Sequence, residues 1–279
     1  MTHSIYDLHT HSHCSDGELT PTALVEAAKA RGVSVLGLTD HDTVAGVSEA
    51  YDAANGDIDI VAGIELSCLW KGRNIHIVGL NIDIDIENPV LSAGIEQQGK
   101  ARVDRAAEIA RRLTLKGIDG ALEGARGYSG NGIIGRPHFA RYLVDNGHVK
   151  TMAQAFKQYL GTGKVGDVKQ CWPSIDTAIA WIMAAGGTAV LAHPDKYGLT
   201  RTKLYSLLEA FVTAGGGAIE VVNGVQDNNV TLKLVRAAND FNLLASCGSD
   251  FHREGQPWQA LGCCRELPEQ CNAIWDSWL

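Results

Sequence analysis

The chain has 279 residues, of which 45% are hydrophobic, and a formal net charge of -8. This size and apolar content allow a large buried core, in one domain or in one domain with an insert, and they argue against disorder. The negative charge argues against indiscriminate nucleic-acid binding, and without an apolar run of roughly 18 residues or a signal region we expect a cytoplasmic protein with no membrane association.

Short β-branched and aliphatic runs alternate with helical segments along most of the chain. The runs predict seven strands, at residues 4–8, 33–38, 58–66, 75–82, 188–192, 218–222 and 243–246. Thr20-Pro21 and Ser174 are typical of helix starts between these strands. The alternation predicts an α/β fold with a mostly parallel sheet.

One strand is expected to run against the others. The sequence Trp70-Lys-Gly-Arg-Asn74 is typical of a hairpin turn. Reversal of the chain there would place Glu65, near the end of one strand, beside His76 at the start of the next. Both side chains would then face the same rim of a barrel.

Between about residues 99 and 166 the alternation stops, and we expect a mostly helical insert. It would contain a helix at 101–115, a glycine-rich stretch at 127–135 that is either a flexible loop or a substrate lid, and a helix at about 152–159. Residues 100–169 carry 13 Lys and Arg against 6 Asp and Glu, whereas the remainder carries 11 against 26. A basic insert in an acidic chain suits an anionic substrate, although an ordinary solvated helical surface would have the same composition.

Histidines and acidic residues form short motifs, here called phrases, that are spread over nearly the whole chain. Most follow a predicted strand at its carboxyl end, the face that carries barrel active sites, and residues two apart share one side of an extended segment. This ligand set suits Mn, Fe or Zn better than Mg or Ca. The pattern indicates a multinuclear metal hydrolase. The nine candidate ligands are His9, His11, Asp16, His41, Glu65, His76, His193, Asp250 and His252.

These phrases resemble those of the PHP superfamily, named for polymerase and histidinol phosphatase. The matching phrases are Asp7-x-His9-x-His11, Ser15-Asp16-Gly17, Thr39-Asp40-His41-Asp42, Ala192-His193-Pro194 and Ser249-Asp250-x-His252, with Glu65 and His76. The stretches Gly135-Arg-Pro-His-Phe-Ala140 and Tyr159-Leu-Gly-x-Gly163 are similar to the branch that contains RNase AM and the nucleoside 3′,5′-bisphosphate phosphatases.

The resemblance implies a distorted seven-stranded (β/α) barrel, formed by residues 1–98 and 167–279, with residues 99–166 as a basic helical insert beside the substrate. It also implies three divalent metal ions, with Mn expected first and Fe or Zn as alternatives. The implied ligands are His9, His11, Glu65 and Asp250 for one ion, Glu65, His76 and His193 for a second, and Asp16, His41 and His252 for a third. His13, close to Asp16, is an alternative ligand of the third ion.

The implied activity is that of a phosphoesterase that removes phosphate from nucleotides such as nucleoside 3′,5′-bisphosphates and trims short RNA or RNA 5′ ends. Water activated as hydroxide by paired metal ions would attack phosphorus. The expected catalytic residues are Glu65, His193, Asp250 and Arg136. The expected substrate-binding residues are Asp16, His41, Lys100, Arg102, Arg136 and His138, with the arginines as bidentate phosphate ligands.

Other readings stay open from the sequence alone. A histidinol-phosphate phosphatase, a non-catalytic metal-binding regulatory module and a zinc amidohydrolase are alternatives, and we expect no obligate protein partner. Asp7, Asp40 and Asp42 would orient ligand imidazoles or cap turns. Trp172 and Trp258 fit core packing better than base stacking.

Overall fold

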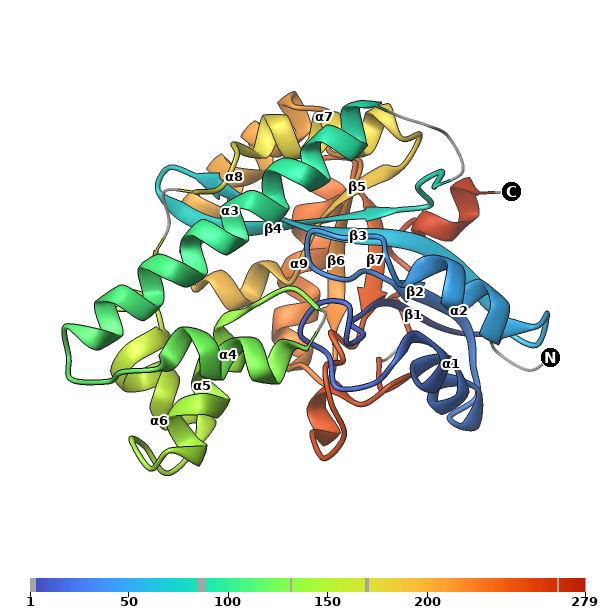
Figure 1. Ribbon diagram of the computed structural model, residues 1–279. Coiled ribbons are helices and arrows are strands. Elements are labelled where there is room, and N and C mark those ends of the chain that lie inside the picture. The colour runs from blue at the N-terminus through green and yellow to red at the C-terminus, as the bar shows by residue number, and fades with distance from the viewer. Residues whose placement is uncertain (1–3, 85–88, 131, 169–170, 265, 279) are drawn as a thin grey trace.

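The computed structural model describes residues 4–84, 89–130, 132–168, 171–264 and 266–278. Seven strands form one sheet that curls into a nearly closed barrel (Figure 1). They are β1 (Ile5–Thr10), β2 (Val33–Leu38), β3 (Asp59–Trp70), β4 (Arg73–Leu80), β5 (Thr188–Leu191), β6 (Ala218–Asn223) and β7 (Leu244–Gly248). Their spatial order follows the chain, and only β4 runs antiparallel to its neighbours. The predicted α/β class and the seven strands are confirmed.

Helices cover the outer face of the barrel and build a lobe at one side of it (Figure 1). The barrel helices are α1 (Pro21–Ala30), α2 (Val47–Ala54), α7 (Ile175–Ala184), α8 (Arg201–Thr213) and α9 (Asn228–Asp240). The long α3 (Pro89–Thr114) leads into the lobe of α4 (Ala121–Ser129), α5 (Arg136–Asp145) and α6 (Met152–Ala155), which continues as a π-helical turn (Phe156–Leu160). Short 3-10 turns lie at Pro194–Tyr197, Pro257–Gln259 and Ile274–Ser277. In the part of the chain that the structure describes, no helix combines the length and apolarity needed to span a membrane.

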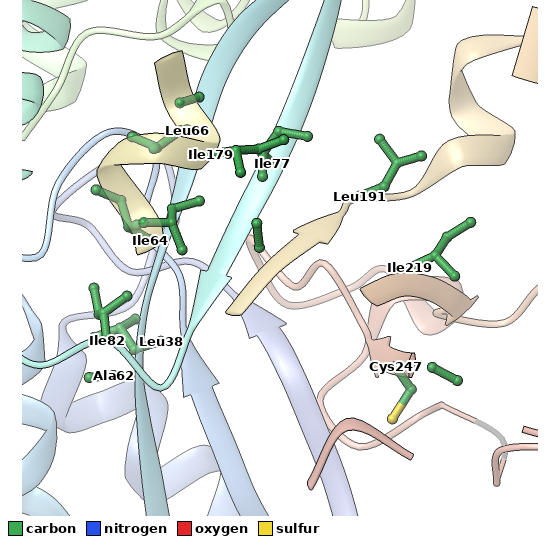
Figure 2. Close-up of a cluster of buried hydrophobic side chains, with 14 of the residues drawn as sticks. Leu38, Ala62, Ile64, Leu66, Ile77, Ile82, Ile179, Leu191, Ile219 and Cys247 are labelled. Carbon is green, nitrogen blue, oxygen red and sulfur yellow. The ribbon is translucent and has the colours of Figure 1, made fainter. Parts of the chain in front are cut away.

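Apolar side chains on the strands pack beneath the barrel helices. Figure 2 shows Leu38, Ile64 and Ile77 on successive strands, with Ile179 of α7 packed against this group. Full burial of one such side chain is worth about 1.5 to 3 kcal/mol. The lobe has an apolar cluster of its own, which includes the fully buried Phe139 of α5. The boundary between barrel and insert, expected near residue 99, falls inside α3.

The hairpin between β3 and β4 determines where one side of the site lies. The two strands pair from Gly63 opposite Leu80 to Trp70 opposite Arg73. The turn residues between them, at positions 71 and 72, both have positive φ, as a two-residue hairpin turn requires. The predicted turn is confirmed, and β3 continues beyond its predicted end at residue 66 because the ladder extends to this turn.

Two predicted elements of the insert differ in their bounds from those of the structure. The helix expected to begin at residue 101 begins at Pro89. Gly94, in its second turn, lets α3 lie close to α7, because a Cβ added at Gly94 would lie 2.4 Å from the Trp181 side chain. The first three residues of the glycine-rich stretch, 127–129, form the last turn of α4, and Gly135 is the N-cap of α5, so the loop expected there is confined to the residues between them. Asn131, within that stretch, lies outside the described residues.

We predict that Phe139→Ala lowers the free energy of unfolding by about 3 to 5 kcal/mol, because it empties the centre of the lobe cluster. The matched control is Val103→Ala on α3, whose side chain is 62% exposed and should change stability by less than about 0.5 kcal/mol. Urea denaturation followed by circular dichroism measures both. A loss below about 1 kcal/mol for Phe139→Ala would contradict the assigned packing.

Candidate active site

All nine candidate ligands meet at the end of the barrel where the parallel strands finish. They come from β1, β3 and β4 and from the segments that follow β1, β2, β5 and β7. Their donor atoms form four overlapping groups, and within each group all donor atoms lie within 4.8 Å of one another. The groups are His9, His11 and Asp250; His9, Glu65 and His193; His41, Glu65 and His76; and His11, Asp16, His41 and His252.

The carboxylate of Glu65 lies at the centre of the cluster and is fully buried. Its Oε1 is 2.9 Å from both His76 Nδ1 and His193 Nε2. Its Oε2 is 2.9 Å from His41 Nδ1, 3.3 Å from His11 Nε2 and 3.4 Å from His9 Nε2. Both oxygens therefore face several ligand nitrogens, an arrangement suited to a carboxylate that bridges two cations.

Several buried polar atoms of the cluster fit bound cations better than hydrogen bonds. Among the described residues, Glu65 Oε2 and His41 Nδ1 lie 2.9 Å apart and Asp16 Oδ1 lies 3.2 Å from His252 Nε2, but neither of these contacts has the geometry of a hydrogen bond. Each such atom costs about 1 to 3 kcal/mol when it is left unsatisfied. A mixed set of imidazole nitrogens and carboxylate oxygens suits Mn, Fe or Zn. The residues present therefore fit divalent metal ions.

Buried acceptors fix the orientation of two of the imidazoles. His9 Nδ1 donates to Glu220 Oε1 at 2.7 Å, and His252 Nδ1 donates to the Asp250 carbonyl at 2.9 Å. In both rings Nε2 then faces the cluster and can bind a cation once it has lost its proton. Glu220 Oε2 also accepts from the His193 backbone N–H at 2.5 Å, so one carboxylate positions two candidate ligands.

Electrostatics keep the carboxylates of the cluster ionised. Burial by itself would raise the pKa of Asp16, Glu65 and Asp250, but neighbouring imidazoles, and Lys196 beside Asp250, hold all three pKa values well below normal. Burial lowers the pKa of His11 to about 3. That imidazole is neutral at pH 7, which is the ligating form. Although burial alone would lower the pKa of His9, His41 and His252, the neighbouring carboxylates raise all three, that of His252 to about 9, so a bound cation would have to displace a proton from each of these imidazoles.

The three aspartates adjacent to the ligands hold the chain around them. Asp40 accepts from the backbone N–H of Ser12 at 2.7 Å and from the hydroxyl of Ser15 at 2.6 Å, which fixes the loop that carries Asp16. Asp7 accepts from backbone N–H groups at positions 249 and 262. Asp42 accepts from the backbone N–H of Ser67 at 2.7 Å and from the side chains of Gln98 and Arg102. None of these hydrogen bonds joins an aspartate to a ligand imidazole, so of the two expected roles the three aspartates have that of fixing turns. The carboxylate that orients an imidazole is Glu220.

Three residues at the site have positive φ, a backbone conformation that residues other than glycine rarely adopt. Asp42, His193 and Asp250 have φ values of 55°, 29° and 55°. Such conformations persist where the surroundings over-determine them, and they concentrate at functional sites. Here the chain turns sharply after β2, β5 and β7 and directs these side chains inward.

A cavity of about 120 Å³ joins the cluster of candidate ligands to three arginines, two on α3 and one on α5. Asp16, His41 and His76 line it on one side and Arg102, Arg105 and Arg136 on the other. Their guanidinium groups also have neighbours within the protein. Arg105 lies 5.2 Å from the Trp172 ring, and Arg136 donates to the Leu160 carbonyl at 3.2 Å.

The three arginines differ in how much of their charge is already compensated. Arg102 is bound to the buried carboxylate of Asp42 at 2.6 Å and to Ser67 at 3.1 Å. Burial, together with the nearby guanidinium groups of Arg136 and Arg102, lowers the pKa of Arg105 to about 9. A bound anion would relieve this repulsion. The cavity is therefore suited to a phosphate group.

The structure places three other candidate residues away from this cavity. Lys100 is exposed and does not line it, and the side chain of His13 is exposed. His138 Nδ1 accepts from the backbone N–H of Gly135 at 2.9 Å, which caps the start of α5.

Sequence reasoning missed Glu220 and Lys196, and it left Arg105 as either a substrate residue or an ordinary surface charge. Glu220 is a carboxylate within an otherwise apolar strand, and that contrast was a usable signal. Arg105 lies one helical turn after Arg102, so it shares the same face of α3. Lys196, which contacts Asp250 Oδ2, follows the His193-Pro194 phrase closely, but its spacing alone gives no indication of that contact.

Comparison with known proteins agrees with this geometry. A family model described as the PHP domain matches residues 7–107. A 3′,5′-nucleoside bisphosphate phosphatase of Chromobacterium violaceum is 42% identical over 271 residues, which cover 96% of this chain and 94% of that protein. A 5′-3′ exoribonuclease of Haemophilus influenzae is 44% identical over 272 residues, covering 97% of this chain and 98% of that protein.

A solved structure has the same fold. It is an amidohydrolase from Chromobacterium violaceum with bound sulfate and no metal, and it matches with a TM-score of 0.91 and 41% identity over 98% of this chain and 95% of that one. The barrel, the buried histidine and carboxylate cluster and the near full-length relatives lead to one conclusion. The chain belongs to the PHP family of metal-dependent phosphoesterases and is a phosphoric-ester hydrolase.

Proposed function

We propose that the protein hydrolyses the 3′-phosphate of nucleoside 3′,5′-bisphosphates and, at the same site, removes nucleotides from the 5′ end of short RNA. The observation that carries this proposal is the cavity that joins the metal cluster directly to Arg105 and Arg136. A substrate with two phosphates can place one at each end of that cavity. A substrate with one phosphate can use only one end.

We also propose that three divalent ions, Mn in the first place, occupy the cluster. His9, His11 and Asp250 would hold one ion, His76 and His193 a second, with Glu65 between them, and Asp16, His41 and His252 a third. Ions bound there would lower the pKa of water and polarise the phosphoryl oxygens. The buried atoms of Glu65, His41 and Asp16 that lack a hydrogen bond support this occupancy.

The protein residues would divide the remaining work. Arg105 and Arg136 bind the phosphate that is not cleaved and so fix the distance of the other phosphorus from the cluster. Glu220 holds His9 and His193 in position. Water adds its oxygen to phosphorus, the P–O3′ bond breaks, and the 3′ oxygen takes a proton.

The relatives support the same substrates. One is named for nucleoside bisphosphates and another for RNA, and both align with this chain almost from end to end. The sulfate in the solved relative is an anion of the charge and shape of phosphate. These likenesses favour nucleotides over histidinol phosphate, which carries a single phosphate.

The direct test is phosphate release from a nucleoside 3′,5′-bisphosphate and from histidinol phosphate, each with and without added Mn. We expect Mn-stimulated release from the bisphosphate at a kcat/KM at least about tenfold higher than for histidinol phosphate. His9→Ala should lose both metal and activity. A protein that is inactive on the bisphosphate, or whose His9→Ala variant keeps its metal content, would overturn the proposal.

Replacement of Glu220 should weaken metal binding, although Glu220 itself is not a proposed ligand. Glu220→Gln removes one of the two acceptor oxygens that hold His9 and His193, so we expect a loss of about 10- to 100-fold in Mn affinity. Mn titration against a chelator measures this loss. Glu209→Gln, an exposed glutamate of α8, is the matched control and should bind Mn like the parent. Equal affinities in the two variants would show that Glu220 has no such role.

Replacement of Arg136 should separate substrate binding from metal binding. We expect Arg136→Ala to raise KM and lower kcat for the bisphosphate, so that kcat/KM falls about tenfold, because a guanidinium contact to phosphate is lost. Metal content, measured by mass spectrometry of the dialysed protein, should stay unchanged. Arg141→Ala, on the same helix with an exposed side chain, is the control. Loss of metal from Arg136→Ala would contradict the assignment.

A further inference from the structure

The metal cluster opens into a second cavity on the side away from the three arginines. The arginine cavity adjoins β2, β3 and β4, whereas this one adjoins the segments that follow β5, β6 and β7. Its volume is about 370 Å³. His193 and Glu220 line its inner end, and Val225 and Trp258 line it further out. Nothing in the proposed phosphatase reaction uses this space.

Trp258 was expected to pack in the core, and that expectation was wrong because its side chain is 54% exposed. Its backbone is nevertheless fixed, since its carbonyl accepts from the Val225 N–H at 2.8 Å. Gly224 has φ of 55°, and a Cβ there would lie 2.3 Å from the Trp258 carbonyl oxygen. A tryptophan held beside the site with its ring in solvent is suited to stacking on a nucleobase.

The cavity continues as a groove between α8 and α9. A neighbouring cavity of about 380 Å³ shares Pro194 and Val230 with the first. Arg201, Lys233 and Arg236 line it, against Asp195 as the one acidic group among its described lining residues. The chain outside the insert is strongly acidic, so three cations along one groove are a local exception that suits a phosphate backbone.

The chemistry of RNA explains why such a space would be present. A phosphodiester differs from a terminal 3′-phosphate only in carrying a second nucleoside. When Arg105 and Arg136 hold the 5′-phosphate and the scissile phosphorus lies at the cluster, that nucleoside has to leave the site on the side away from the arginines. The cavity at Trp258 lies there, and the groove beyond it would receive the following phosphates.

We propose that the Trp258 cavity binds the nucleotide on the 3′ side of the scissile phosphate, and that the groove between α8 and α9 binds the next phosphates of a single-stranded RNA. The inference rests on the proposed function. Water adds to phosphorus, the P–O3′ bond breaks and the 3′ oxygen takes a proton, so the shortened RNA keeps a 5′-phosphate. It can therefore re-enter the arginine cavity for another cycle.

Three substrates of increasing length test the proposal: a nucleoside 3′,5′-bisphosphate, a 5′-phosphorylated dinucleotide and a 5′-phosphorylated hexanucleotide. Trp258→Ala should lower kcat/KM about tenfold for the dinucleotide and the hexanucleotide, because a stacking contact is lost. For the bisphosphate, kcat/KM should stay within about twofold of the parent. Trp258→Phe keeps an aromatic face and should restore most of the activity on both RNA substrates.

Lys233→Glu tests the groove separately. It should lower kcat/KM about fivefold for the hexanucleotide at low salt and less at high salt, with little change for the dinucleotide, which is too short to reach the groove. Lys203→Glu is the matched control, because this exposed lysine of α8 does not line the groove.

The outcomes separate the two proposals. Parent protein that cleaves the bisphosphate but neither RNA overturns the inference and the RNA part of the proposed function, whereas parent protein that cleaves none of the substrates overturns the proposed function as a whole. Equal loss on all three substrates in Trp258→Ala, or no loss on either RNA, also overturns the inference. Equal effects of Lys233→Glu and Lys203→Glu would contradict the proposal that the groove between α8 and α9 binds RNA.

Discussion

The buried negative charge of Glu65 is the constraint on which the arrangement of this barrel depends. An ionised carboxylate without compensation inside a protein costs several kcal/mol, and here five imidazoles from four separate segments surround it. The reversed direction of β4 matters for the same reason. Because Glu65 pairs with Val78, the side chain of His76 falls diagonally opposite on the same face of the sheet.

The cluster lies between two spaces of different character. On one side the lobe supplies compact positive charge, and on the other the segments after β6 and β7 supply an exposed aromatic ring and a longer basic groove. A metal cluster alone would accept many phosphate esters. Under the proposed function, discrimination between substrates would come from what the two sides bind.

Much of this site could be predicted from the sequence, for physical reasons that are easy to state. Strand ends fix where His11 or His193 must lie, so local patterns were enough to predict that the nine candidate ligands would meet; their roles as ligands stay a prediction. Glu220, Arg105 and Trp258 were missed, left undecided or misjudged because their environments depend on neighbours far away in the sequence. The role of the carboxylate at 220 depends on β1 bringing His9 beside it, and the backbone of Trp258 is held by contacts with Gly224 and Val225, 34 and 33 residues earlier in the chain.

The buried ion pair between Arg102 and Asp42 has a further consequence. Gln98, one turn earlier on α3, also donates to Asp42, at 2.9 Å, so α3 is fastened twice to the loop that follows β2. The next turn of α3 carries Arg105, which is thereby kept at a set distance from the histidines. With the substrate proposed above, the enzyme would select substrates by the distance between their two phosphates. It would not discriminate between the bases of nucleotides that have this phosphate spacing.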